Sequence, residues 1–255
     1  VELEVEKLDN IIKACDTPDE VELWENLKAA CVNGRRTGLG THGLADALAC
    51  LSIAYDSKEA IKVIDNIYST FKVAAYTESV NLAQERGAFP VFNWDKEKNN
   101  AYIQSLPNNL QELIAKFGRR NISILTNAPT GSVSIMSQTS SGIEPVFRNS
   151  YTRRRKLSHN ETDIKADFID ELGDKWTEYE VFHHNIRAYL DANNTTEIPD
   201  FFTESDAIDW ETRVRIQATI QKHIDHSISS TINLPKGTDP EVVSRLYHLG
   251  WKLGL

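Results

Sequence analysis

The segment Ala128–Ser134 (APTGSVS) carries the residue types that a phosphate-binding loop needs. Gly131 lets a ligand approach the backbone closely. Hydroxyl groups are offered by Thr130, Ser132 and Ser134. The apolar residues that follow predict a helix start, where unpaired N–H groups and the positive end of the helix dipole attract an anion. The segment is not a Walker loop, because no Gly-Lys-Ser or Gly-Lys-Thr follows. An ordinary capped turn is the alternative interpretation.

A second unusual segment, SSGIEP, occupies residues 140–145. Glu144 precedes a proline and two apolar residues, so the pattern predicts a strand over 144–147 with a carboxylate at its start. We expect this carboxylate to face a pocket. A solvent-exposed turn is the alternative.

The histidines do not form a metal site at any standard spacing. His223 and His226 lie three residues apart in a predicted helix, but a zinc site needs three or four converging ligands. We therefore predict no metal. His42 lies in a glycine-rich turn between Gly40 and Gly43, where we favour a structural role.

Composition limits the partners of the chain. Its 255 residues include 40% hydrophobic and 25% charged residues, and the net charge is -9. These values are typical of a soluble globular protein, and the acidic balance argues against a nucleic-acid partner. No stretch is apolar enough for a membrane helix. The one basic cluster, residues 153–156, is interpreted as a solvated face, with contact to an anionic ligand or partner as the alternative.

The cysteines and the chain ends give two further expectations. Cys15, Cys31 and Cys50 are odd in number and lack CxxC spacing, which is typical of a reducing, cytoplasmic environment. The first residue is valine and the last is leucine, so we expect the chain to be part of a longer protein.

Hydrophobic periodicity predicts helices that alternate with buried strands. The helices are expected over residues 19–32, 41–55, 58–86, 110–117, 206–228 and 240–252. The strands are expected over residues 121–126, 144–147 and 229–234, the first and last of them interior and parallel. Residues 158–194 form the least regular segment. This order predicts an α/β architecture.

Several blocks, taken together in their order and spacing, resemble the large chains of ribonucleotide reductases. They are RRTGLGTHGLADAL (35–48), ERGAFP (85–90), APTGSVS (128–134), SGIEPVF (141–147) and TINLP (231–235). The third and fourth blocks are more similar to the adenosylcobalamin-dependent class than to the iron-dependent class.

The resemblance implies a ten-stranded α/β barrel around a finger loop, with residues 1–255 as a single domain that supplies about the second half. The family reduces the 2′-hydroxyl of ribonucleotides through a thiyl radical on a finger-loop cysteine in an Asn-x-Cys-x-Glu motif. That motif is absent here, and none of the three cysteines matches a catalytic position. We therefore expect no catalytic residue in this chain and no activity from the chain alone.

What the resemblance assigns to this chain is the substrate-phosphate loop. Its residues are Ala128, Pro129, Thr130, Gly131, Ser132, Val133 and Ser134. The implied partners are a ribonucleotide substrate, adenosylcobalamin and the remainder of the catalytic chain. An opened barrel exposes strand edges and apolar faces, so we also expect self-association. A phosphate-binding module without turnover and a glycyl-radical barrel enzyme are the alternatives.

Overall fold

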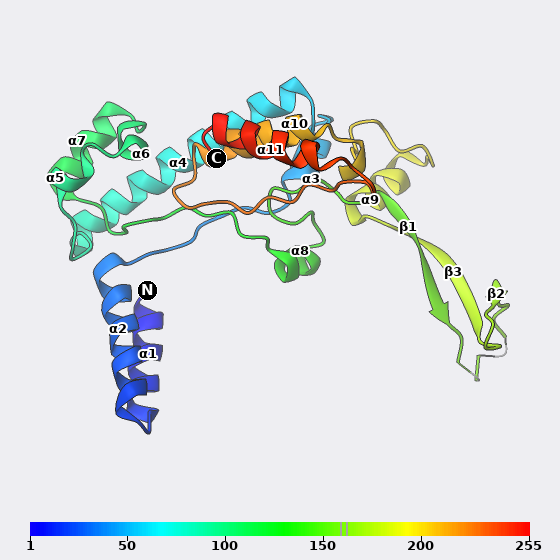
Figure 1. Ribbon diagram of the computed structural model, residues 1–255, viewed down its shortest axis with the longest axis horizontal. Coiled ribbons are helices and arrows are strands. Elements are labelled where there is room, and N and C mark those ends of the chain that lie inside the picture. Colours follow the sequence, from blue (N-terminus) through cyan, green and yellow to red (C-terminus); the bar gives the residue numbers. More distant parts are fainter. Residues whose placement is uncertain (159, 162) are drawn as a thin grey trace.

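The long helix α4 (Lys58–Arg86) runs through the body of the molecule and forms one side of its core (Figure 1). The computed structural model describes residues 1–158, 160–161 and 163–255. Ser57 accepts a hydrogen bond from the Ala60 N–H and caps the first turn, and the buried residues of the helix recur every three or four positions. The helices α7 (Asn108–Phe117) and α10 (Trp210–Gln221) pack on this helix.

The core fills the space between these helices. Ile64, Ile114, Ile216 and Ile220 are fully buried there, together with Leu125 from an extended segment. Each fully buried aliphatic side chain of this size contributes about 1.5–3 kcal/mol relative to an exposed one. Packing against α4 and α10 therefore holds the extended segment in place.

The other helices are short or peripheral. They are α1 (Glu2–Ala14), α2 (Pro18–Gly34), α3 (Leu44–Cys50), α5 (Trp94–Glu97), α6 (Ala101–Gln104), α8 (Gly131–Ser137), α9 (His184–Asn193) and α11 (Pro240–Lys252). Two helices are shorter than the sequence predicts. Of the helix predicted over residues 41–55, only α3 forms. In place of the helix predicted over residues 206–228, the chain forms a 3-10 turn (Ser205–Ala207) followed by α10. The chain turns after both helices and buries Ile53 and Ile224 in the core. Among the described residues, no helix could cross a membrane.

Residues 121–126 form the buried extended segment that the sequence predicts. The Leu39 N–H donates to the Ile124 carbonyl at 2.8 Å, and the Thr126 N–H donates to the Leu39 carbonyl at 2.9 Å. Leu39 and Leu125 thereby form a parallel bridge. Gly40 permits this approach, because a Cβ atom there would lie 2.3 Å from the Thr126 carbonyl oxygen. The burial is confirmed, and the single bridge is parallel, but residues 121–126 form no continuous strand and no parallel sheet is present among the described residues.

The prediction of an interior strand over residues 229–234 is wrong. The segment has no strand structure, and four of its residues are exposed. β propensity reports how well a side chain packs against neighbouring strands, and no described strand lies beside this segment. Residues 144–147 are likewise extended without forming a strand, with one parallel bridge between Val146 and Glu204.

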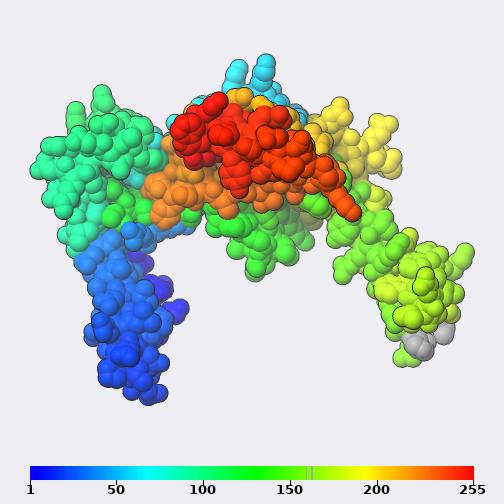
Figure 2. Space-filling view, viewed as in Figure 1, coloured from blue at the N-terminus to red at the C-terminus, as the bar shows by residue number. Residues whose placement is uncertain are grey.

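The three-stranded sheet of the described residues is antiparallel and largely occupies the segment expected to be least regular. It consists of β1 (Ser150–Lys156), β2 (Phe168–Ile169) and β3 (Lys175–Phe182), in the order β1-β3-β2. These strands form an arm that projects from the body, as does the α1–α2 hairpin at the other end (Figure 2). The basic cluster lies on β1, where the ion pairs Arg154–Glu178 and Lys156–Asp174 cross to the β3 side of the arm. These ion pairs partly neutralise the cluster within the arm.

Candidate functional site

The loop Ala128–Thr130 leads from the buried extended segment into α8. Thr130 has φ 51°, and its left-handed conformation turns the chain into the helix. The N–H groups of Gly131, Ser132 and Val133 have no hydrogen-bond acceptor among the described residues. A Cβ atom at Gly131 would meet nothing within 4 Å. The loop therefore presents three backbone donors with open space beside them.

The three hydroxyl groups of the loop are used differently. Ser132 is exposed, and its hydroxyl has no partner among the residues described. The Thr130 hydroxyl oxygen accepts a hydrogen bond from the Gly142 N–H at 2.7 Å. Ser134 is 2% exposed; its hydroxyl donates to the Gly131 carbonyl at 2.9 Å and lies 2.8 Å from the Ser141 hydroxyl. Ser132 is thus free to meet a ligand, whereas Ser134 holds the loop from beneath. Ala128 and Pro129 are exposed at its entry.

The turn over residues 139–142 supports the loop. The Thr139 N–H donates to the Ser134 carbonyl at 3.0 Å, which adds to the contacts of Ser141 and Gly142. Gly142 has φ +50°, and a Cβ atom there would lie 3.0 Å from the Ala128 carbonyl oxygen. Glycine is therefore required for this close approach. The two segments that the sequence marks as unusual form one structural unit.

The start of α3 holds the other side of the same turn. The Gly43 N–H donates to the Ser140 carbonyl at 2.9 Å, and the Ser140 N–H donates to the Asp46 carboxylate at 2.5 Å. His42 lies next to this contact, with its Nδ1 3.0 Å from the Thr139 hydroxyl. The glycine-rich turn around His42 thus serves to dock α3 against the loop support.

Asp46 is a buried carboxylate with several donors around it. It is 6% exposed, and its Oδ1 lies 2.7 Å from Nε2 of His183, which follows β3. Burial opposes ionisation, but hydrogen bonds from His183, Asn185 and the Ser140 N–H outweigh burial and lower the pKa of Asp46 to about 2. Asp46 is therefore charged at neutral pH. No local sequence signal marks this residue as a partner of the 139–142 turn.

Glu144 lines a cleft of about 430 Å3 beside the loop. The cleft is shared with Ser134 and Ser141, and the Arg213 guanidinium donates to the Glu144 carboxylate at 2.7 Å. Arg213 is 3% exposed, so its charge requires this partner. Glu144 thus faces a pocket, which is one of the two interpretations that the sequence leaves open, and the ion pair fixes its orientation.

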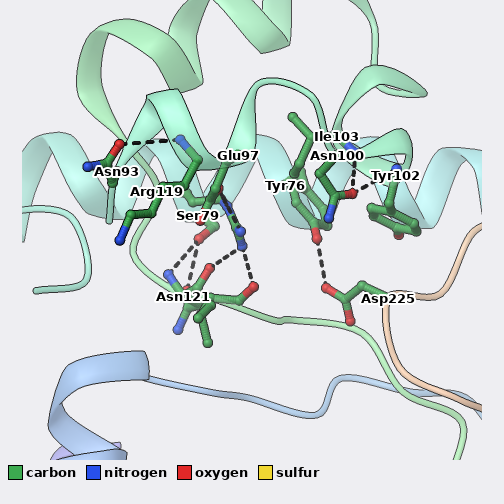
Figure 3. A network of polar contacts seen from close by, with 12 residues as sticks. Tyr76, Ser79, Asn93, Glu97, Asn100, Tyr102, Ile103, Arg119, Asn121 and Asp225 are labelled. Carbon is green, nitrogen blue, oxygen red and sulfur yellow. Dashed lines mark hydrogen bonds and ion pairs between the residues drawn. The ribbon is translucent and has the colours of Figure 1, made fainter. Parts of the chain in front are cut away.

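Asp225 fixes the extended segment that leads into the loop. Its carboxylate accepts hydrogen bonds from the N–H groups of Ile124 at 2.8 Å and Leu125 at 3.0 Å. The Tyr76 hydroxyl also donates to Asp225, at 2.7 Å (Figure 3). Burial and the Asp225 charge raise the pKa of Tyr76, so the hydroxyl remains a donor. Three donors from two elements thus converge on one side chain.

The two histidines of the predicted helix turn to different partners. His223 Nε2 lies 2.7 Å from Asp65, and His226 Nε2 lies 2.7 Å from the Ser123 hydroxyl. Within the described part of the chain, no group of three or more His, Cys, Asp or Glu side chains is placed to hold a metal ion.

A buried segment with one parallel bridge leads through an open loop into a helix, which is an order of elements typical of α/β proteins. Residues 1–255 match the family model described as ribonucleotide reductase, barrel domain. The chain therefore belongs to the ribonucleotide reductase barrel family, as its sequence blocks predict. The fold is accordingly part of an α/β barrel.

Proteins that are similar to this chain are named ribonucleoside-diphosphate reductases. The vitamin B12-dependent ribonucleoside-diphosphate reductase of Mycobacterium tuberculosis is 30% identical, over 96% of this chain and 33% of that protein. The protein of the same name from Thermoplasma acidophilum is 28% identical, over 95% of this chain and 29% of its own length. The ribonucleoside-diphosphate reductase subunit alpha of Helicobacter pylori is 28% identical, over 100% of this chain and 31% of its own length. The chain spans about a third of the length of these relatives.

Proposed function

We propose that this chain works within a complete ribonucleotide reductase, which converts ribonucleotides to 2′-deoxyribonucleotides. The family match over residues 1–255 and the names of the relatives support this activity. The role of this chain in that activity is supported by three open backbone N–H groups, on Gly131, Ser132 and Val133. No described group competes for them.

The role that we propose for residues Ala128–Ser134 is to bind the terminal phosphates of the ribonucleotide. Hydrogen bonds from backbone donors to a charged phosphate are roughly twice as strong as those between neutral groups. The exposed Ser132 hydroxyl would add a fourth donor. The contacts of Thr130 and Ser134 with the 139–142 turn hold these donors in place before the substrate arrives, which reduces the entropy lost on binding.

We propose that the radical chemistry takes place outside this chain. The Cys15 thiol donates a hydrogen bond to the Ile11 carbonyl, and neither Cys31 nor Cys50 takes part in the described hydrogen bonds around the loop. The chain's own role is to bind and orient the substrate, and the complete enzyme supplies the reacting thiol.

The cofactor that we propose for the complete enzyme is adenosylcobalamin. Relatives from Mycobacterium tuberculosis and Thermoplasma acidophilum are named vitamin B12-dependent. When bound, this cofactor supplies the radical that starts the reaction. The described residues around the loop offer hydroxyls, backbone donors and internal ion pairs, and these groups do not form a site for the corrin ring.

We further propose that the remainder of the catalytic chain and a second copy cover the exposed apolar surface. Tyr247 and Trp251 of α11 are 78% and 74% exposed, beside a groove between α10 and α11. Patches of this kind mark contact sites. The proposed compartment is the cytoplasm, which suits three unpaired cysteines.

The proposed activity is tested with the complete reductase chain, adenosylcobalamin and a dithiol. Formation of deoxyribonucleotide from ribonucleoside di- or triphosphates is the expected result. Reduction of neither substrate class, in a preparation that binds the cofactor, would contradict the proposal.

A further inference from the structure

Asp46 lies at the meeting point of three segments that are far apart in the sequence. Its carboxylate holds the Ser140 N–H, 94 residues away, and the His183 ring, 137 residues away. A buried carboxylate is costly unless hydrogen-bond donors surround it, so each partner is fixed in place by the charge. The 139–142 turn and the end of β3 are therefore both positioned by one side chain of α3.

The contacts continue from Ser140 into the loop. On one side of the turn, Asp46 and the Gly43 N–H hold Ser140. On the other side, Gly142 donates to the Thr130 hydroxyl and Ser141 meets Ser134. Thr130 and Ser134 flank the three open N–H groups. A shift of the 139–142 turn would therefore move Thr130 and Ser134, the two residues on either side of the open N–H groups.

We propose that Asp46 is a positioning residue for the substrate-phosphate loop, acting through the Ser140 turn without touching the substrate. This inference rests on the proposed function of the loop. Donors displaced by a fraction of an ångström would bind the phosphates less well in both the substrate complex and the transition state. The loss would therefore appear in KM and not in kcat.

A merely structural role for Asp46 predicts a different result. If the carboxylate only stabilised the fold, its removal would reduce the fraction of folded enzyme, and kcat per total protein would fall with KM unchanged. The division of the effect between KM and kcat separates the two roles.

The chain offers a control in Asp65, which is more exposed than Asp46 but holds the same kind of partner. Asp65 also lies on a helix, and its Oδ1 also lies 2.7 Å from a histidine Nε2, that of His223. It bonds to Lys222 as well, but has no described contact with the loop or with the 139–142 turn. Asp65→Ala therefore removes a similar aspartate–histidine pair away from the loop.

The experiment compares Asp46→Ala, Asp46→Asn and Asp65→Ala in the complete reductase. We expect Asp46→Ala to raise the KM for the ribonucleotide by about 10-fold or more, with kcat changed less than about 2-fold. Asp46→Asn keeps one acceptor oxygen and should fall between Asp46→Ala and the wild type. Asp65→Ala should leave KM unchanged.

Hydrogen exchange of the same proteins provides a readout that needs no turnover. Backbone amides of residues 128–142 should exchange faster in Asp46→Ala than in the wild type, and at the wild-type rate in Asp65→Ala. Unchanged exchange in Asp46→Ala, or a loss of kcat at constant KM, would overturn the inference. If the wild type reduces no ribonucleotide, the proposed function fails, while the exchange rates still decide whether Asp46 positions the loop.

Discussion

The Thr130 hydroxyl oxygen accepts a hydrogen bond from the Gly142 N–H at 2.7 Å, and this contact joins the two most unusual segments of the sequence. Thr130 has left-handed backbone geometry at the start of α8, and the bond holds it in that geometry. The open N–H groups of the following residues are consequently fixed in direction.

Gly131→Val should weaken substrate binding while the fold stays intact. A side chain at this position meets nothing within 4 Å, so it should be tolerated, yet it would occupy the space in front of the backbone donors. Loss of one charge-assisted hydrogen bond, worth about 1.5–3 kcal/mol, should raise KM by roughly 10- to 150-fold. Steady-state kinetics of the complete reductase measure this change.

Ser132→Ala is the comparison for Gly131→Val. It removes one exposed hydroxyl and keeps the backbone donor, so its KM should rise less. Equal KM values for both variants and the wild type would argue against phosphate binding at this loop.

Asp225→Ala should destabilise the chain. The substitution leaves the N–H groups of Ile124 and Leu125 and the Tyr76 hydroxyl without their acceptor. Unsatisfied buried donors cost about 1–3 kcal/mol each, so with three donors affected we expect the free energy of unfolding to fall by at least about 3 kcal/mol. Urea unfolding followed by circular dichroism tests this.

Asp95→Ala is the control for Asp225→Ala, because the carboxylate of Asp95 is 84% exposed in its ion pair with Lys98. Its removal should change stability little. A loss for Asp225→Ala no larger than that for Asp95→Ala would show that Asp225 does not hold the extended segment.

Asp46 should make stability depend on pH in the acid range. Its pKa is lowered from 3.8 to about 2 in the folded chain, so its contribution is fully present above pH 4 and is lost as the pH falls toward 2. The difference in unfolding free energy between the wild type and Asp46→Asn should therefore shrink over that range. Urea titrations at several pH values measure it, and a difference that stays constant with pH would exclude a lowered pKa.

The 255-residue chain alone should not reduce ribonucleotides, even with adenosylcobalamin and a dithiol. The Asn-x-Cys-x-Glu motif is absent from the sequence, and the three cysteines stand outside the described loop contacts. Product analysis after incubation tests this. Deoxyribonucleotide above the protein-free control would require one of these cysteines to react.

The sequence predicts the loop of the site better than it predicts the distant residues that contact the loop's supporting turn. The loop chemistry of residues 128–134 and the pocket beside Glu144 follow from neighbouring residues, because turns and helix starts are encoded locally. The role of Asp46 could not be predicted, since its partners lie 94 and 137 residues away. Nothing in a single sequence shows which distant N–H or imidazole a carboxylate will meet.

In the fold, as in the site, the sequence predicts elements that local residues decide and fails for elements that depend on distant contacts. The long helix α4 has clear caps and a regular apolar stripe, and it was predicted closely. The strand expected over residues 229–234 is absent, because β-rich residues form a strand only when a neighbour pairs with them. The antiparallel arm was missed because β1 carries a run of basic residues and little apolar alternation.

A structure of the complete reductase with a bound ribonucleotide would show whether the loop's backbone donors hold the substrate phosphates. We predict phosphate oxygens at about 2.7–3.1 Å from the backbone nitrogens of Gly131, Ser132 and Val133. Phosphates bound at another site, with these three N–H groups still unpaired or bonded to protein atoms, would contradict the account.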